Sequence, residues 1–247
     1  MKSLRNTCLI LGLLGLIPPV AVAQQAPAFI LMDQEPHHHL TLQNEFVKVF
    51  KVEVAPGDSI IMHRHDGDTV AIAVGEQMVT VGYPDKPEVH QKNPDGQLRL
   101  QKSGYVHSTR VDPGTAYHTV AVELLHAQSN PRNLCAAVMA GLPLNCPDMP
   151  KSNSSAKYIE EPQFNSDQTH VQMVRVLPGQ KMNFGDAMHF QLIVALDPAL
   201  YGPSVGYGPS KKVNPGDFFW YEKGMTSLPF ISMGTNEARF VEFDFNP

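Results

Sequence analysis

The stretch that decides the fold is PGDSIIMHRHDGDTVAIAVG, residues 56–75. It opens on a Pro-Gly-Asp turn signal and continues into short apolar and β-branched runs, which are typical of strands. His63 and His65 stand one residue apart, so on an extended chain both imidazoles point to the same face. The pair predicts either a metal site completed by a third ligand from elsewhere, or a buried strand whose histidines are hydrogen-bonded.

The chain begins MKSLRNTCLILGLLGLIPPVAVAQQ, with a basic start, an apolar run and small residues at Ala21 and Ala23. This order is typical of a secretory signal peptide. We therefore predict a leader over residues 1–23 and a periplasmic or secreted mature protein. The apolar run is short for a membrane span, and a retained N-terminal anchor is the alternative.

Charge and composition exclude some partners. The chain has 19 Lys+Arg against 24 Asp+Glu, a formal net charge of -5, and loss of Lys2 and Arg5 with the leader makes it more negative. An acidic chain without a basic run is a poor partner for nucleic acid or an anionic membrane surface. We expect a small-molecule ligand or substrate, no nucleic acid and no stable membrane insertion, and we leave a homodimer open.

Two cysteines, Cys135 and Cys146, follow the predicted leader. In an oxidising exported compartment, a pair this close in sequence predicts a disulfide. The alternative is two free buried thiols. A catalytic thiol is disfavoured, because neither cysteine has a basic or histidine-rich sequence beside it.

Most of the remaining chain has the pattern of strands and turns. EFVKVFKVEV, TVAIAVG, QMVTVGYP and HTVAVELL alternate or run apolar, and Gly, Pro, Asp and Asn stand between them. No stretch predicts a long amphipathic helix. The pattern favours an all-β barrel or sandwich. The polar stretch 153–167 lacks a sustained period and is interpreted as part of a linker.

Three short segments recur in order at a nearly constant offset. VEVAPG, ending at Gly57, is echoed 122 residues later by VRVLPG, ending at Gly179. The other echoes pair Gly96 with Gly216, Gly104 with Gly224 and Glu123 with Glu242. Such an ordered repetition predicts a duplicated β domain.

Two spacings in the first half resemble the two signature motifs of the cupin superfamily. The first motif starts at Gly57, with five residues before His63 and one more before His65. The second motif consists of Gly96, Lys102, Gly104 and His107. In that superfamily the two motifs bring histidines together around one metal inside a small β-barrel. The resemblance thus supplies the missing third ligand, His107.

The resemblance implies two tandem cupin-type barrels of the double-stranded β-helix or jelly-roll kind. The N-terminal barrel, with the metal site, is expected over residues 35–146, and a linker over 147–167. A degenerate C-terminal barrel is expected over 168–247. The implied cofactor is a divalent metal ion (Fe, Mn, Ni, Zn or Cu) held by His63, His65 and His107.

The first half departs from the cupin pattern in ways that affect the chemistry. The usual glutamate ligand is replaced by Thr69 or Val70, and Asp68 stands one residue early and is expected to point away. A Lys and a Val replace the usual proline and asparagine of the second motif, at Lys102 and Val111. The remaining three histidines resemble the set of the three-histidine thiol dioxygenase-like cupins. Such a set leaves up to three positions open on the metal.

The second half has lost the site. Asn183, Gly185 and His189 stand near the expected positions of the first motif, and Ser227 replaces the histidine of the second. A lone His189 is more often a surface or packed histidine than a ligand. The second barrel is therefore interpreted as a packing or substrate-shaping partner.

The other histidines have simpler interpretations. Residues 37–39 are three histidines that precede the first predicted strand, and we expect them to be solvated. The alternative is that one of them reaches the barrel mouth, or that they bind metal adventitiously. His118 is the reserve ligand if the second motif is misplaced. His90, His126 and His170 are expected at the surface or in structural roles.

Two functions from different classes remain open. The first is an exported metal-dependent enzyme, an oxygenase, isomerase or lyase of unknown substrate, whose catalytic residues stay unidentified. The second is a non-catalytic barrel that binds a small polar or sugar-like ligand, because cupins host both kinds of function. Tyr105 lies close enough in sequence to His107 to reach an open metal position, and Glu123 is expected to need a partner if it faces inward.

Overall fold

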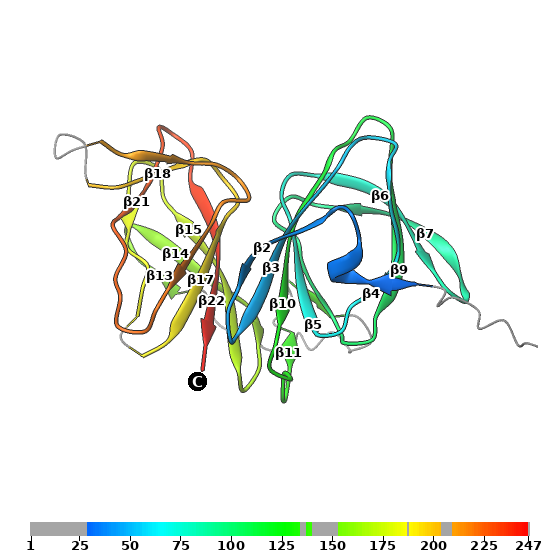
Figure 1. Cartoon of the computed structure of the whole chain (residues 1–247). Coiled ribbons are helices and arrows are strands. Elements are labelled where there is room, and N and C mark those ends of the chain that lie inside the picture. The colour runs from blue at the N-terminus through cyan, green and yellow to red at the C-terminus, as the bar shows by residue number, and fades with distance from the viewer. Residues whose placement is uncertain (1–28, 134–136, 140–152, 187, 204–208, 247) are drawn as a thin grey trace, which may run out of the picture.

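The computed structural model describes residues 29–133, 137–139, 153–186, 188–203 and 209–246. In these ranges the chain forms two β-barrels side by side, the first coloured blue to green and the second yellow to red (Figure 1). The predicted leader and both predicted disulfide cysteines, Cys135 and Cys146, lie outside the described residues. Over the described ranges, no helix is long and apolar enough to cross a membrane.

The first barrel consists of two sheets. One sheet has the order β1-β4-β9-β6-β7, with bounds Ile30–Leu31, Ser59–Arg64, Val106–Val111, Gln77–Tyr83 and Lys86–Asn93. The other has the order β12-β8-β5-β10-β3-β2, with bounds Ala137–Met139, Leu98–Gln101, Asp68–Ala73, Tyr117–Leu124, Val47–Val54 and His38–Gln43. A 3-10 helix, η1, spans Met32–Gln34.

The second barrel also consists of two sheets. One has the order β11-β14-β15-β22-β17-β20, with bounds Arg132–Asn133, Tyr158–Asn165, Thr169–Val176, Ala238–Phe245, Phe190–Ala195 and Phe218–Tyr221; β13, Asn153–Ser154, also pairs with β14. The other has the order β16-β21-β18-β19, with bounds Lys181–Met182, Phe230–Ser232, Ala199–Tyr201 and Lys211–Val213.

The strand order of the first barrel recurs in the second. β10 lies between β3 and β5, and β22 lies between β15 and β17 in the same way. Gly57 and Gly179, which end the first echoed segment, occupy matching turns with positive φ angles of 86° and 69°. Only glycine adopts such angles without strain. The two barrels therefore agree with the duplication that the sequence echoes predict.

Two strands lie in segments for which the sequence predicts a linker or a solvated stretch. The linker predicted over 147–167 contains β14, and the predicted solvated histidines 38 and 39 begin β2. Each strand carries a register shift, at Leu40/Leu42 in β2 and between Pro162 and Phe164 in β14. In each strand the bulge interrupts the alternation of inward and outward residues.

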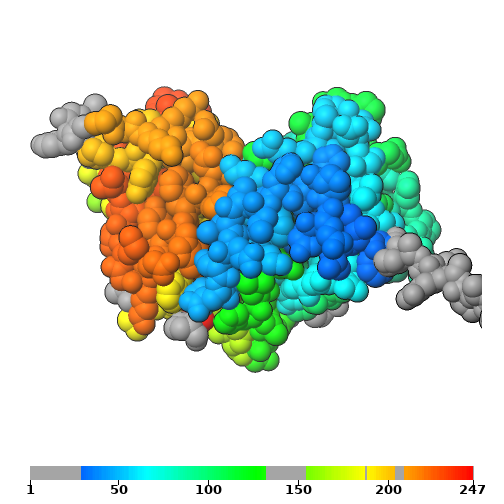
Figure 2. All heavy atoms as spheres, viewed as in Figure 1, coloured from blue at the N-terminus to red at the C-terminus, as the bar shows by residue number. Residues whose placement is uncertain are grey.

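The largest hydrophobic cluster lies between the barrels. It joins buried side chains of the first barrel, including Val49, Val70, Leu98 and Val122, to those of the second, including Val171, Leu192, Val241 and Phe243. The space-filling view shows the two lobes in contact along this junction (Figure 2). Strands such as β10 are thus buried on both faces, which explains the nearly continuous apolar run in HTVAVELL.

Candidate metal centre

Three histidines meet inside the first barrel. His63 lies in β4, His65 follows the end of that strand, and His107 lies in β9. β4 and β9 are antiparallel, and His63 and His107 are direct partners in the register. The β4 pairing has a register shift between Ile60 and His63, which aims the following residues into the barrel. The structure therefore brings together the three side chains that the motifs single out.

The three imidazoles present nitrogen atoms to one point. The Nε2 atom of His65 lies 3.2 Å from that of His63 and 3.0 Å from that of His107. All three candidate ligand atoms lie within 4.8 Å of one another. Two nitrogens bound at about 2.1 Å to one ion, at right angles, would lie about 3.0 Å apart. The spacing therefore fits a single transition-metal ion.

Burial keeps these imidazoles neutral. His63, His65 and His107 are only 0%, 2% and 7% exposed, respectively. Burial lowers the pKa of His63 to about 4 and the pKa values of the other two well below the ordinary range. A neutral imidazole has the lone pair that a metal requires.

The tautomer of His63 is set by its backbone neighbour. Its Nδ1 lies 2.9 Å from the carbonyl oxygen of Ile61, so Nδ1 carries the proton and Nε2 carries the lone pair. The Nδ1 atoms of His65 and His107 are buried without a hydrogen-bond partner. If these two imidazoles also carry the proton on Nδ1, three Nε2 lone pairs converge in a dry site and need a cation or a shared proton between them.

A buried carboxylate supports this site from the N-terminal segment. Glu35 accepts hydrogen bonds from His38 Nδ1 at 2.8 Å, from His37 Nδ1 at 3.1 Å and from the Ile61 backbone N–H at 3.4 Å. Burial alone would raise the pKa of Glu35, but the bonds from His38 and His37 hold that pKa at about 2. Glu35 thus connects the N-terminal segment to the backbone that orients His63.

The prediction that histidines 37–39 are solvated is wrong for His38. Its side chain is only 5% exposed, and its ring centroid lies 4.8 Å from that of His63. The reason is that β2 pairs with β3 and carries this segment over the barrel. The signal available in the sequence was the spacing of Glu35 and His38, which stand three residues apart.

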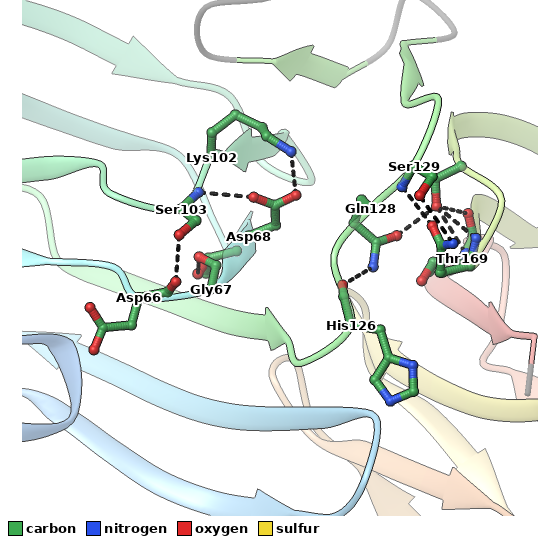
Figure 3. A network of polar contacts seen from close by, with 12 residues as sticks. Asp66, Gly67, Asp68, Lys102, Ser103, His126, Gln128, Ser129 and Thr169 are labelled. Atoms are coloured by element: carbon green, nitrogen blue, oxygen red, sulfur yellow. Dashed lines mark hydrogen bonds and ion pairs between the residues drawn. The ribbon is translucent and has the colours of Figure 1, made fainter.

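Asp68 does not join the histidines, as expected. It accepts a hydrogen bond from the Ser103 backbone N–H at 2.9 Å and forms an ion pair with Lys102 (Figure 3). Lys102, the departure from the usual proline, therefore has a partner in the neighbouring strand. Glu123 is also buried and accepts a bond from the Gly67 N–H at 2.9 Å. Neither carboxylate replaces the missing cupin glutamate.

His118 does not lie with the three clustered histidines. Its ring lies outside the first barrel against Gly216 of the second, and its nearest charged partner is Glu53, with 3.7 Å between Nε2 and Oε1. His90 and His126 lie at the surface, as predicted, bonded to Asp112 Oδ2 and to the backbone oxygen of Glu45.

A polar cavity adjoins the histidines inside the first barrel. Its volume is about 30 Å³, more than the roughly 10–15 Å³ that a single water molecule needs. His107 and Tyr105 border it, and the rings of these two residues lie 4.8 Å apart. Burial, and then the neighbouring Tyr83, raise the pKa of Tyr105, so its hydroxyl stays protonated. Alternate residues of β8 also point into it, including Arg99.

The corresponding region of the second barrel is closed by hydrogen bonds. Asn183 Nδ2 donates to the Ser227 backbone oxygen at 2.6 Å, and the Phe184 N–H donates to Ser227 Oγ at 2.7 Å. A Cβ atom on Gly185 would lie 2.2 Å from the Met225 oxygen, so no larger side chain fits there. His189 bonds instead to Asp186, at 2.9 Å. Among the described residues, the first barrel holds the one cluster with metal-ligand spacing.

No protein-family model and no curated protein matches the sequence. Solved structures match the fold. AerE from Microcystis aeruginosa has a TM-score of 0.53 at 7% identity, over 86% of this chain and 99% of that chain. A Bacillus subtilis oxalate decarboxylase with Mn(II) centres has a TM-score of 0.50 at 14% identity, over 82% and 70%. A cupin 2 conserved barrel domain protein from Leptotrichia buccalis has a TM-score of 0.50 at 10% identity, over 84% and 87%.

The fold and site define a two-barrel β protein with a buried three-histidine centre in its first barrel. Its fold is that of the cupins, with two barrels in tandem, as the resemblance of the motifs implies.

Proposed function

We propose that this protein holds one divalent metal ion at His63, His65 and His107 and acts with it on a small molecule in the first barrel. The observation that carries this proposal is the convergence of three buried, neutral imidazole nitrogens at a spacing that fits one ion. Imidazole ligands suit Fe, Mn, Ni, Zn and Cu, so the donor set leaves the identity of the metal open. The Mn(II) centres of the Bacillus subtilis neighbour are a precedent in this fold.

The metal and the chain would have separate tasks. A divalent ion at this site supplies Lewis acidity, and redox chemistry where the ion is iron, manganese or copper. The chain contributes a dry, shaped cavity. Tyr105 covers His65 and His107 with its ring, and its hydroxyl donates to Tyr83 at 3.2 Å, which limits water on that side. The candidate reactions at such a site are an oxygenation, an isomerisation and a lyase reaction.

The test is elemental analysis of the protein purified from its own host. The wild type should carry about one equivalent of a transition metal, and the variant His63→Ala/His65→Ala/His107→Ala should carry almost none. The surface variant His90→Ala is the matched control and should keep the metal, because His90 is exposed and pairs with Asp112. Equal metal in the wild type and the triple variant would refute the site.

A binding module is the second candidate. It is favoured by the composition of the cavity wall, because none of the described residues that line it is acidic, and a carboxylate is a common general acid or base. Turnover of a substrate that stops on chelation and returns with metal would favour the enzyme. Tight binding of a small ligand that survives chelation, without turnover, would favour the module.

A further inference from the structure

Arg99 is a cation inside the first barrel without a matching anion. It lies in β8 between two leucines of the inter-barrel core, so strand alternation turns its side chain the other way, into the cavity. Its register partner in β5 is Ala71, whose small side chain leaves room in front of the guanidinium. We propose that Arg99 is the anchor for a small carboxylate ligand that carries a hydroxyl group, bound beside His107.

The charge of Arg99 is not neutralised by the protein. The other arginines with ion pairs, such as Arg64, Arg175 and Arg239, each contact an Asp or Glu, whereas in the described part of the chain no carboxylate pairs with Arg99. Its Nε atom is buried without a hydrogen-bond partner. A half-buried guanidinium needs acceptors, and a carboxylate offers two oxygens that match its fork.

Two unpartnered hydrogen-bond acceptors on the cavity wall indicate that the ligand also carries a donor group. Gln77 Nε2 donates to the His118 backbone oxygen at 2.6 Å, which turns Gln77 Oε1 toward Asn93. Asn93 Nδ2 donates to that oxygen at 3.2 Å, so Asn93 Oδ1 is left facing away from it, buried and unpartnered. Gln97 Oε1, also on the cavity wall, is buried and unpartnered as well. Buried acceptors of this kind call for a donor, which a hydroxyl group supplies.

The position of this subsite relates it to the metal centre. His107 and Arg99 both line the cavity. A ligand held at Arg99 therefore lies against the wall that carries a metal ligand. The inference deepens the proposed function, because it names the ligand class of the same cavity, but the anchor itself requires no metal.

Isothermal titration of the chelator-treated, metal-free protein at pH 8 tests the inference. Histidine side chains are neutral at pH 8, so an anion in the cavity has the guanidinium of Arg99 as its charged partner. The probes are glycolate, acetate and ethylene glycol. Glycolate should bind most tightly, acetate should bind several-fold more weakly because it lacks the hydroxyl, and ethylene glycol should show no heat.

The variant Arg99→Met should weaken glycolate binding at least tenfold. Arg110→Met removes the same charge from the outside of β9, where Arg110 pairs with Glu88, and should leave binding unchanged. Arg99→Lys keeps the charge but loses the two parallel N–H donors of the guanidinium, so its glycolate affinity should lie between those of the wild type and Arg99→Met. Fluorescence of the single tryptophan, Trp220, reports that each variant is folded.

Three outcomes would overturn the inference: no glycolate binding by the wild type, equal binding of glycolate and ethylene glycol, or full affinity in Arg99→Met. Metal content, measured separately on the untreated samples, distinguishes this failure from that of the proposed function. An Arg99→Met protein that keeps its metal and its glycolate affinity refutes the anchor alone, whereas a wild type without metal refutes the metal centre alone.

Discussion

The imidazole of His118, on the first barrel, lies directly over Gly216 of the second. A Cβ atom on Gly216 would lie 2.6 Å from both Cε1 and Nε2 of that ring. The contact is flanked by an ion pair between Lys51 and Asp217, with 3.5 Å between Nζ and Oδ1. The glycine thus lets the two sheets approach at the edge of the shared hydrophobic cluster.

The variant Gly216→Ala should therefore destabilise the contact between the barrels. Gly216 and Gly224 both have a φ angle of 82°. At Gly224, however, an added Cβ atom would have no other atom within 4 Å, so Gly224 is the matched control. We expect Gly224→Ala to lose about 1 kcal/mol from backbone strain alone. Gly216→Ala should lose about 1 kcal/mol more, because the His118 ring must turn out of its position to admit the methyl group.

Urea unfolding followed by Trp220 fluorescence measures both variants. The further variant Gly216→Ala/His118→Ala should recover most of the extra loss, because the ring that obstructs the methyl group is gone. Equal destabilisation at positions 216 and 224 would mean that the contact between ring and glycine contributes nothing.

Glu242 predicts a pH dependence that is independent of the metal. It is buried in the second barrel, where Gln172 and Gln191 donate to its two oxygens at 2.6 and 2.8 Å. Burial, and then the nearby Asp244, raise the pKa of Glu242 from 4.5 to about 8. The folded protein thus holds a proton that the unfolded chain releases. Its contribution is complete below pH 4.5 and is lost as the pH rises through about 8.

Over that range the free energy of unfolding should fall by up to about 1.4 kcal/mol per pH unit from this group. The variant Glu242→Gln should remove the slope, and the exposed surface variant Glu76→Gln should retain it. The measurement is urea unfolding from pH 5 to pH 8, taken as the difference from wild type, so that the histidines cancel. Parallel curves for the wild type and Glu242→Gln would show that Glu242 is ionised throughout.

Much of the fold and part of the site could be predicted from the sequence, for physical reasons that differ by residue. His63 and His107 lie in short strands and His65 directly follows one, and their spacing from tight glycine turns carries the resemblance that supplied the third ligand. Glu35 and His38 reach the site because β2 pairs with β3. This pairing is a tertiary contact, and the bulge in β2 weakens the sign of it in the local sequence.

The alternation of inward and outward residues along the strands could have placed two further residues. Tyr117 and Thr119 line the cavity of the first barrel, so His118 between them must face the other way, and its reserve role could have been excluded. Arg99 stands between two leucines in the same manner and could have been placed inside. What alternation cannot give is the absence of a carboxylate opposite Arg99 among the described residues, because that depends on strands far apart in the sequence.

Glu35 should influence metal affinity without binding the metal. It holds the backbone N–H of Ile61, whose carbonyl oxygen accepts the Nδ1 proton of His63. Glu35→Gln replaces one acceptor oxygen by a donor and removes the charge, so we expect metal affinity to fall about tenfold. Competition with a chromophoric chelator measures the affinity. The control is Asp33→Asn, because Asp33 is an exposed acidic residue in the same segment. If both variants lowered the metal affinity equally, the effect would come from the loss of negative charge and not from the hydrogen bonds of Glu35.

Mass spectrometry of the protein from its own host tests the leader and the disulfide together. We predict that the chain begins after Ala23, and that its intact mass is lower than the reduced formula by the mass of two hydrogens, because Cys135 and Cys146 are bonded. Two titratable thiols on unfolding would contradict the bond. An N-terminus at residue 1 or 2 would contradict the leader, and the retained anchor would then be the better interpretation.

Metal stoichiometry separates the two barrels. We expect one metal per chain, because the second barrel replaces its ligands by Asn183 and Ser227, which bond to each other, and has no room at Gly185. His107→Ala should release most of the metal, since two imidazoles leave a weak site, whereas three fixed by paired strands are preorganised. Ser227→Ala and His118→Ala should both keep one equivalent. Two equivalents in the wild type, or loss in His118→Ala with retention in His107→Ala, would show that the ligand set is wrong.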